Sequence, residues 1–144
     1  IYRALRQMPL TIESEGKATR DFIYVDDIVQ GLTLCGSVGV AGETYNLASG
    51  VETSILDLAN RINGLSNNST PMEFVPGRPW DHSGRRFGST EKANRELGFE
   101  AVVGLEEGLT RTIDWTRNNM TLIDGCIARH ASHMDAIRQD TEAR

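Results

Sequence analysis

The sequence has little cysteine, no excess of positive charge and no long apolar run. Cys35 and Cys126 are its only cysteines, and both fall in apolar-periodic stretches, which indicates free, buried thiols in a reducing cytoplasm. A net charge of -5 provides no general attraction for nucleic acid or an anionic membrane. No apolar stretch approaches the ~18 residues of a membrane span, and we see no signal peptide. The first residue is Ile1 rather than methionine, so we expect a chain that begins inside a longer protein or has been trimmed.

The amount of apolar material suits one domain of ordinary size. The chain has 144 residues, of which 39% are hydrophobic. β-Branched and aromatic runs predict strands, the first two of which would form a small hairpin; they cover residues 10–14, 20–25, 43–48 and 72–75. Helical spacing and capping residues predict helices; they cover residues 1–7, from Asp26 or Asp27 to about 36, from Thr53 or Ser54 to about 64, 89–97 and 105–119. This order, without a regular βαβ rhythm, predicts a small α+β lobe of short strands and helices.

The chain divides into a lobe and a tail. Residues 1–119 carry the clear periodic pattern, whereas residues 120–144 predict a helical tail that frays after about Ser132 because the sequence there is polar. The tail is longer than the lobe needs, which raises the hypothesis that it supports self-association. Light scattering of a chain that ends at Asn119 tests this hypothesis.

Three glycines have a misleading spacing. Gly36, Gly39 and Gly42 follow the pattern G-x-x-G-x-x-G, which is similar to a dinucleotide-binding loop. Such a loop needs a strand before the glycines and a helix after them, so that the helix N-terminus faces the pyrophosphate. Here a helical pattern precedes them and a predicted strand follows, so we interpret them as a helix-to-strand connection.

Two segments carry residues suited to a phosphorylated ligand. Arg20 enters a predicted strand, and its planar guanidinium matches a phosphate, while Phe22 is expected to project from the same face beside a base or sugar. Arg78 lies in a Gly- and Pro-rich loop with Asp81, whose carboxylate can accept hydrogen bonds from ribose hydroxyls, and with Arg85 and Arg86 nearby. Taken singly, each segment is explained better without a ligand, the first by a surface ion pair and the second by a solvated basic loop.

Two further groupings are weaker. Asp81, His82 and Ser83 have the residue types of a hydrolytic triad, but neighbours in sequence have the wrong geometry for one. Cys126, His130 and His133 have helical spacing, but the chain places no further ligand to close a zinc site. We therefore expect no metal.

Several motifs occur together and in order. They are Arg-Asp-Phe-Ile-Tyr-Val-Asp-Asp at 20–27, Tyr-Asn-Leu-Ala-Ser-Gly at 45–50, Arg-Pro-Trp-Asp at 78–81, Glu-Leu-Gly-Phe at 96–99 and Thr-Ile-Asp-Trp at 112–115. Over residues 1–119 this arrangement resembles the C-terminal, substrate-binding part of extended short-chain dehydrogenases, the NAD-dependent epimerases and dehydratases of nucleotide sugars. UDP-glucose 4-epimerases and dTDP-glucose 4,6-dehydratases share the pattern, which does not choose among them.

The resemblance implies a place in a larger α/β enzyme and a role for particular residues. Arg20 and Arg78 would hold the diphosphate of a UDP- or dTDP-sugar, and Asp81 would bind the ribose. Phe22 would pack beside the nucleotide, and Ile55 would line the base pocket. One departure is Trp80, which replaces the usual glycine of the "RPGD" loop and adds a stacking surface there.

The family's catalytic equipment is missing from this sequence. The reaction needs NAD on an N-terminal Rossmann half and a Tyr-x-x-x-Lys pair, in which lysine lowers the pKa of the tyrosine. Tyr2, Tyr24 and Tyr45 all lack a lysine four residues later. The resemblance therefore implies NAD bound by the other half, which would be this lobe's partner, and it allows a homodimer. The alternative is a stand-alone binding or scaffolding lobe, and the coding frame upstream would discriminate between the two.

Overall fold

The computed structural model describes the backbone of residues 1–80 and 84–142, and the side chains of this range up to residue 131. Its elements are short and of mixed type, as expected for a small α+β lobe. In chain order they are α1 (Tyr2–Leu5), β1 (Thr11–Glu13), the 3-10 turn η1 (Ser14–Gly16), β2 (Thr19–Asp21), α2 (Val25–Val38), β3 (Glu52–Ser54), α3 (Ile55–Ser66), β4 (Glu73–Val75), β5 (Arg85–Arg86), α4 (Glu91–Leu97), α5 (Leu105–Asn118) and α6 (Met120–Glu142).

The strands form two small sheets, and the predicted hairpin between the first two strands is wrong. β1 pairs in parallel with β4, whereas β2 lies between antiparallel β3 and parallel β5. The turn between β1 and β2 explains the difference. Three successive residues, Ser14 to Gly16, have positive φ values of 49°, 57° and 67°, so the chain leaves the plane of β1 instead of folding back along it.

The segment 43–48, predicted as a strand, forms no strand in this structure. Strand formation requires a neighbouring chain that accepts and donates backbone hydrogen bonds. Within the described residues, none lies beside this segment in a ladder. The segment has the composition of a strand but has no neighbouring strand, within the described residues, with which to pair.

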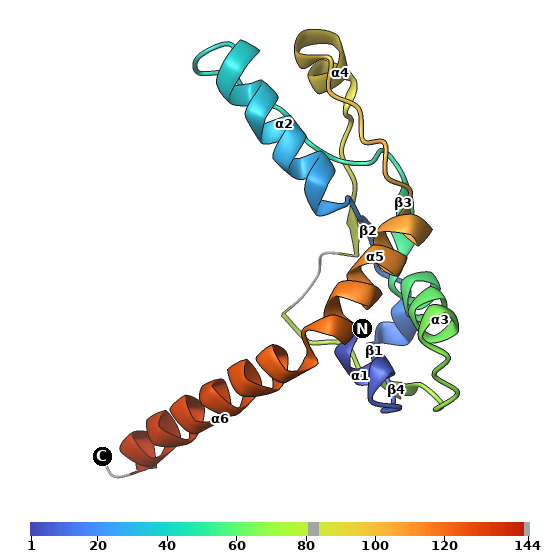
Figure 1. The fold of residues 1–144 in the computed structure, drawn as a ribbon, viewed down its shortest axis with the longest axis vertical. Coiled ribbons are helices and arrows are strands. Elements are labelled where there is room, and N and C mark those ends of the chain that lie inside the picture. Colours follow the sequence, from blue (N-terminus) through green and yellow to red (C-terminus); the bar gives the residue numbers. More distant parts are fainter. Residues whose placement is uncertain (81–83, 143–144) are drawn as a thin grey trace.

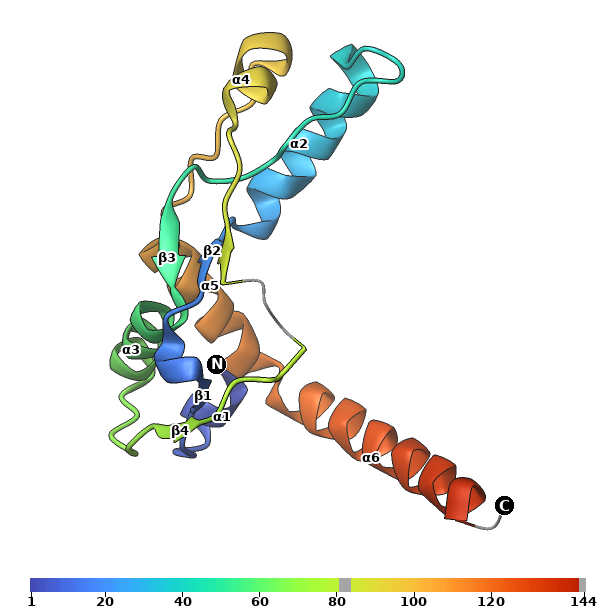
Figure 2. The same ribbon diagram turned by 180° about the vertical axis from the view of Figure 1, so that it is seen from behind.

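Two apolar clusters organise the molecule. One joins α1, α3 and α5 through Ala4, Ile62 and Leu109. The other joins α2 and α4 through the chain that follows α4, with Phe99 almost fully buried against Leu47 and other partly buried side chains. Figures 1 and 2 show the consequence: α2 and α4 form an arm at one end of the molecule, and α1, α3, α5 and the β1–β4 sheet form the body.

The helix ends follow local chemistry in part. Ser54 caps α3 as expected, because its Oγ accepts a hydrogen bond from the Asp57 backbone N at 3.0 Å. Gly98 ends α4 in the left-handed region, with φ 66°. The expectation that Asp26 or Asp27 caps the next helix is wrong. Tyr24 occupies the cap position of α2, and the Asp27 carboxylate instead accepts hydrogen bonds from the backbone N atoms of Val102 and Val103, at 3.2 and 3.0 Å.

Helix α6 leaves the body after a break at Asn119, as Figures 1 and 2 show. Its first turns are tied to α1 by Asp124, whose carboxylate accepts a 2.7 Å hydrogen bond from the Tyr2 hydroxyl and pairs with the Arg6 guanidinium. The backbone is helical through Glu142. The division at residue 119 and the fraying of the tail stay predictions.

Candidate functional site

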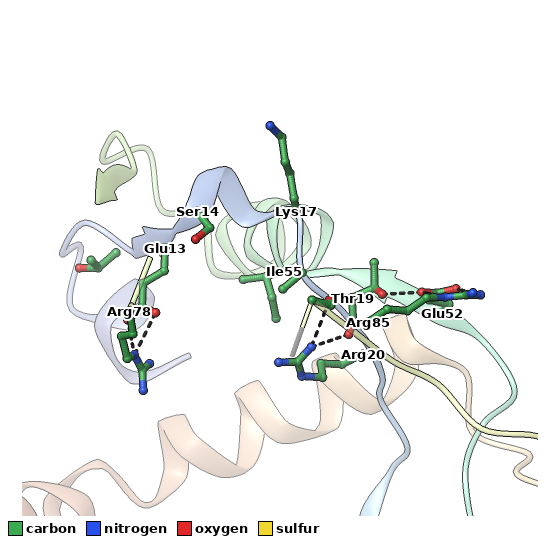
Figure 3. A pocket seen from close by; sticks show the side chains of 12 residues that line it. Glu13, Ser14, Lys17, Thr19, Arg20, Glu52, Ile55, Arg78 and Arg85 are labelled. Atoms are coloured by element: carbon green, nitrogen blue, oxygen red, sulfur yellow. Dashed lines mark hydrogen bonds and ion pairs between the residues drawn. The ribbon is translucent and has the colours of Figure 1, made fainter. Parts of the chain in front are cut away.

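A cavity of about 740 Å³ lies between the two sheets, at the start of α3 (Figure 3). It is lined by residues of β1, η1, β2, β3, the start of α3 and the chain around β5; they are Thr11, Glu13, Ser14, Lys17, Ala18, Thr19, Arg20, Glu52, Ile55, Arg78, Gly84 and Arg85. Strand pairing determines which residues line the cavity. The β1–β4 pair brings the loop after β4 beside β1, and the β2–β5 pair places β5 beside β2.

Arg78 reaches the cavity from the chain that follows β4. The pairing of β4 with β1 places Glu13 opposite Val75, three residues before Arg78. The Arg78 Nε donates to both carboxylate oxygens of Glu13, at 2.9 and 3.0 Å. Its guanidinium carbon also lies 5.3 Å from the centre of the Trp80 ring, a cation–π distance. Glu13 and Trp80 therefore hold this half-exposed cation at one side of the cavity.

Arg20 comes from β2 on the other side. Its Nη1 donates to the Thr19 carbonyl oxygen at 2.7 Å and lies 3.5 Å from the carbonyl oxygen of Gly84. These backbone contacts keep the guanidinium close to the sheet. Figure 3 shows Ile55 between Arg20 and the Arg78–Glu13 pair.

A third arginine at the cavity is held by a carboxylate. Arg85 on β5 donates to Glu52 on β3 through Nε and Nη2, both at 2.7 Å, and the hydroxyl of Thr19 donates to the same carboxylate. The bidentate bond from Arg85, helped by Thr19, lowers the pKa of Glu52 to about 2. Glu52 is thus ionised at neutral pH, and its pair with Arg85 bridges the two strands that flank β2.

The cavity carries a positive excess within an acidic protein. Lys17, Arg20, Arg78 and Arg85 provide four positive charges, and Glu13 and Glu52 provide two negative charges, so the formal balance of the lining is two positive charges. Lys17 is also paired with Glu15 outside the lining, at 2.5 Å. Ile55, the first residue of α3, adds an apolar surface and brings the positive end of the helix dipole to the wall. The arrangement suits an anion that also has an apolar part.

Of the five site residues that the sequence predicts, the cavity brings together Arg20, Ile55 and Arg78. Phe22 lies elsewhere, in apolar clefts beside the start of α5. Strand β2 ends at Asp21, so side-chain alternation no longer places Phe22 on the face of Arg20. Its role beside a nucleotide stays a prediction, without support from this cavity. Asp81 lies outside the described residues.

The sequence reasoning missed Glu13, Lys17 and Glu52. No local signal marks them, because acidic side chains on short strands and a lysine after a turn are common. The place of Glu13 and Glu52 at the cavity depends on pairings with residues far along the chain. Glu13 and Arg78 are 65 positions apart, and Glu52 and Arg85 are 33 apart.

Other predicted features can be placed as well. Gly36 lies within α2 and Gly39 caps its C-terminal end, so a helix precedes these glycines, opposite to the order that a dinucleotide loop requires. Cys126 is exposed, so the expectation that it is buried is wrong. Within the described residues, no cluster of three His, Cys, Asp or Glu side chains could hold a metal ion, and no helix has the length and apolar character to cross a membrane.

Comparison with known proteins gives consistent matches. Residues 3–112 match the family model described as GDP-mannose 4,6 dehydratase. The chain is 35% identical to the UDP-glucose 4-epimerase of Mycolicibacterium smegmatis over 74% of this chain and 34% of that protein. It is 30% identical to the dTDP-glucose 4,6-dehydratase of Salmonella typhimurium over 100% of this chain and 41% of that protein.

Solved structures agree with these sequence matches. The enzyme WbmF of Bordetella bronchiseptica, in complex with NAD+ and UDP, superposes with a TM-score of 0.80 at 50% identity, over 91% of this chain and 38% of that one. The epimerase Mth375 of Methanothermobacter thermautotrophicus superposes with a TM-score of 0.83 at 41% identity, over 86% and 37%. The chain thus spans between 34% and 41% of the length of these four relatives. It belongs to the GDP-mannose 4,6 dehydratase family, within the extended short-chain dehydrogenases whose members include epimerases and dehydratases of nucleotide sugars.

Proposed function

We propose that this chain binds the nucleoside diphosphate part of an NDP-sugar, as the substrate lobe of an NAD-dependent epimerase or dehydratase. The observation that carries the proposal is the cavity in which Arg20 and Arg78 lie on opposite sides, with a formal balance of two positive charges. The pyrophosphate of an NDP-sugar carries one negative charge on each phosphate, so its charge is opposite in sign to that of the cavity. A UDP- or dTDP-sugar is the ligand class that this site fits.

Each group of the cavity has a chemical task in this proposal. The planar guanidinium groups of Arg20 and Arg78 bind phosphate oxygens by paired, charge-assisted hydrogen bonds. Ile55 contributes apolar surface toward the base, and Trp80 keeps Arg78 in place from the outer side. The Glu13 carboxylate orients Arg78, and the Glu52 carboxylate orients Arg85. Both carboxylates repel a phosphate, which disfavours a ligand position beside them.

The whole enzyme would divide its work between two halves. NAD supplies hydride transfer and, in this proposal, binds to a Rossmann half outside this chain, which also provides the tyrosine and lysine that move the sugar proton. WbmF, which binds NAD+ and UDP in its crystal structure, supports this division because the chain matches only part of it. Binding energy from the nucleotide then orients the sugar toward the reacting groups. Two free cysteines suit a cytoplasmic location for such an enzyme.

Calorimetric titration of the protein with UDP and dTDP tests the site. We expect Arg20→Ala and Arg78→Ala each to weaken binding about 10-fold to 100-fold, since hydrogen bonds to charged groups contribute about 1.5–3 kcal/mol. Arg95→Ala is the matched control, because Arg95 on α4 pairs with Glu96 away from the cavity. UMP, which lacks the second phosphate, should bind more weakly than UDP. Unchanged affinities for UDP and dTDP in both cavity variants would show that the site assignment is wrong.

A further inference from the structure

Glu13 lies at the wall of the ligand cavity beside Arg78, one of the two cations proposed to bind phosphate. The Nε of Arg78 donates to both oxygens of the Glu13 carboxylate, at 2.9 and 3.0 Å. Figure 3 shows this pair at one side of the cavity, apart from Arg20 and Ile55. The cation on this side of the cavity is therefore already accompanied by a negative charge.

The fold fixes both members of the pair. β1 pairs in parallel with β4, which places the loop after β4, including Arg78, beside Glu13. In that loop Gly77 packs against η1 so closely that a Cβ there would overlap the Oγ of Ser14, the residue after Glu13. The Trp80 ring lies 5.3 Å from the guanidinium carbon of Arg78. Arg78 is thus held between a carboxylate and an indole, and a ligand meets the ion pair rather than a lone cation.

This geometry makes the charge of a bound phosphate important. Glu13 receives the Nε–H group of Arg78, so a phosphate reaches the guanidinium through Nη1 and Nη2. With a hydrogen bond of about 2.9 Å on either side of the guanidinium, the phosphate and the carboxylate would lie about 6 Å apart. The Arg78 and Glu13 side chains are 54% and 38% exposed, so water weakens the repulsion without removing it. Each additional negative charge on the ligand at this point should then raise the dissociation constant about 3-fold to 10-fold.

We infer that Glu13 determines specificity, because its charge favours an intact NDP-sugar over a free nucleoside diphosphate. The terminal phosphate of an NDP-sugar is esterified and carries one negative charge, whereas that of a free nucleoside diphosphate carries about 1.5–2 at pH 7. The two phosphates share a bridging oxygen, so the extra charge lies near Glu13 whichever phosphate Arg78 binds. The site therefore stays available to the NDP-sugar when free nucleoside diphosphate is present. This inference rests on the proposed function, since it requires a phosphate on Arg78.

The test compares two ligands that differ by one charge. UDP and its β-methyl ester share the base, the ribose and both phosphates, but the methyl group caps the terminal phosphate as the sugar does in an NDP-sugar. Calorimetric titration of the protein with each ligand gives the ratio of their dissociation constants, UDP over ester. Glu13→Gln should lower this ratio about 3-fold to 10-fold, and Glu13→Ala, which removes the same charge, should lower it similarly. Glu13→Asp keeps the charge and should keep the ratio within about 2-fold of that of the unsubstituted protein.

Two controls separate the charge of Glu13 from its structural role. Glu107→Gln removes an exposed carboxylate that is paired with Arg111 on α5, away from the cavity, and should leave the ratio unchanged. In a protein that already carries Arg78→Ala, the phosphate is no longer held beside Glu13, so Glu13→Gln should lose most of its effect on the ratio. Circular dichroism at 222 nm checks that each variant is folded.

Several results would overturn the inference. An equal change in both dissociation constants in Glu13→Gln would show that Glu13 only orients Arg78. A ratio in Glu13→Asp as low as that in Glu13→Gln would show that side-chain length, and not charge, decides the preference. An unchanged ratio in Glu13→Gln, together with weaker binding of both ligands by Arg20→Ala and Arg78→Ala, would exclude the specificity role and leave the proposed function standing. Failure of both ligands to bind the unsubstituted protein would contradict the proposed function and this inference together.

Discussion

Replacement of Asp27 by alanine should destabilise the protein far more than replacement of its neighbour Asp26. Asp27 is only 2% exposed, and its two carboxylate oxygens accept hydrogen bonds from the backbone N atoms of Val102 and Val103, which precede α5. Each hydrogen bond to a charged group contributes about 1.5–3 kcal/mol. Because water can reach the largely exposed Val102 after the change, we expect a loss of about 2–4 kcal/mol in the free energy of unfolding, out of a typical 5–15 kcal/mol.

Asp26→Ala is the matched control for this experiment. Its carboxylate is 69% exposed and lies 3.7 Å from Arg111, so its removal should change stability by about 0.5 kcal/mol or less. Both residues lie in the first turn of α2 and interact similarly with the helix dipole, which therefore cancels in the comparison. Urea denaturation followed by circular dichroism at 222 nm measures both changes. Equal losses for the two variants would refute the reasoning, because they would assign Asp27 a role in the helix terminus only.

Three further predictions concern α2 and the cavity. Gly31→Ala should lower the thermal midpoint, because its new Cβ overlaps Leu47 at a cost of about 1–3 kcal/mol. Gly36→Ala, which has open space around it in the same helix, should raise stability by up to about 1 kcal/mol. A Gly31→Ala variant more stable than Gly36→Ala would contradict the packing. Arg85 holds the pKa of Glu52 near 2, so the ionised Glu52 contributes its full stabilisation above pH 4.5 and loses it as the pH falls toward 2. The loss of unfolding free energy that Glu52→Gln causes at neutral pH should therefore shrink when unfolding is measured at acid pH. A constant deficit down to pH 2 would exclude this linkage. Trp80→Gly should weaken UDP binding about 2-fold to 5-fold by freeing Arg78, while Trp80→Tyr should keep most of the affinity; equal effects in calorimetry would exclude a cation–π role.

Much of the helical structure was predictable because its signals are local. Ser54 caps α3 within one turn, and Gly98 adopts the left-handed conformation that ends α4. The same local reasoning placed Gly36 and Gly39 at the end of a helix and so rejected a dinucleotide loop. Arg20 and Arg78 were recognisable as candidate phosphate ligands through the family motifs that contain them, because their local surroundings alone fit a surface ion pair and a solvated basic loop better.

The remaining features were decided by contacts between distant parts of the chain. Local reasoning placed Asp27 at a helix cap, but its carboxylate found backbone partners 75 and 76 positions away. The β-prone segment 43–48 stayed unpaired because no strand within the described residues lies beside it.

The sequence by itself determined the helices, because their signals lie within a few positions of one another. It also determined the family and three of the cavity residues, because short motifs follow one another in a fixed order along the chain. Only the tertiary structure decided which strands pair, that Glu13 and Glu52 bind Arg78 and Arg85, and that Phe22 lines other clefts. Strand pairing and ion pairs join residues tens of positions apart, and the free energy of such contacts depends on how the whole chain packs.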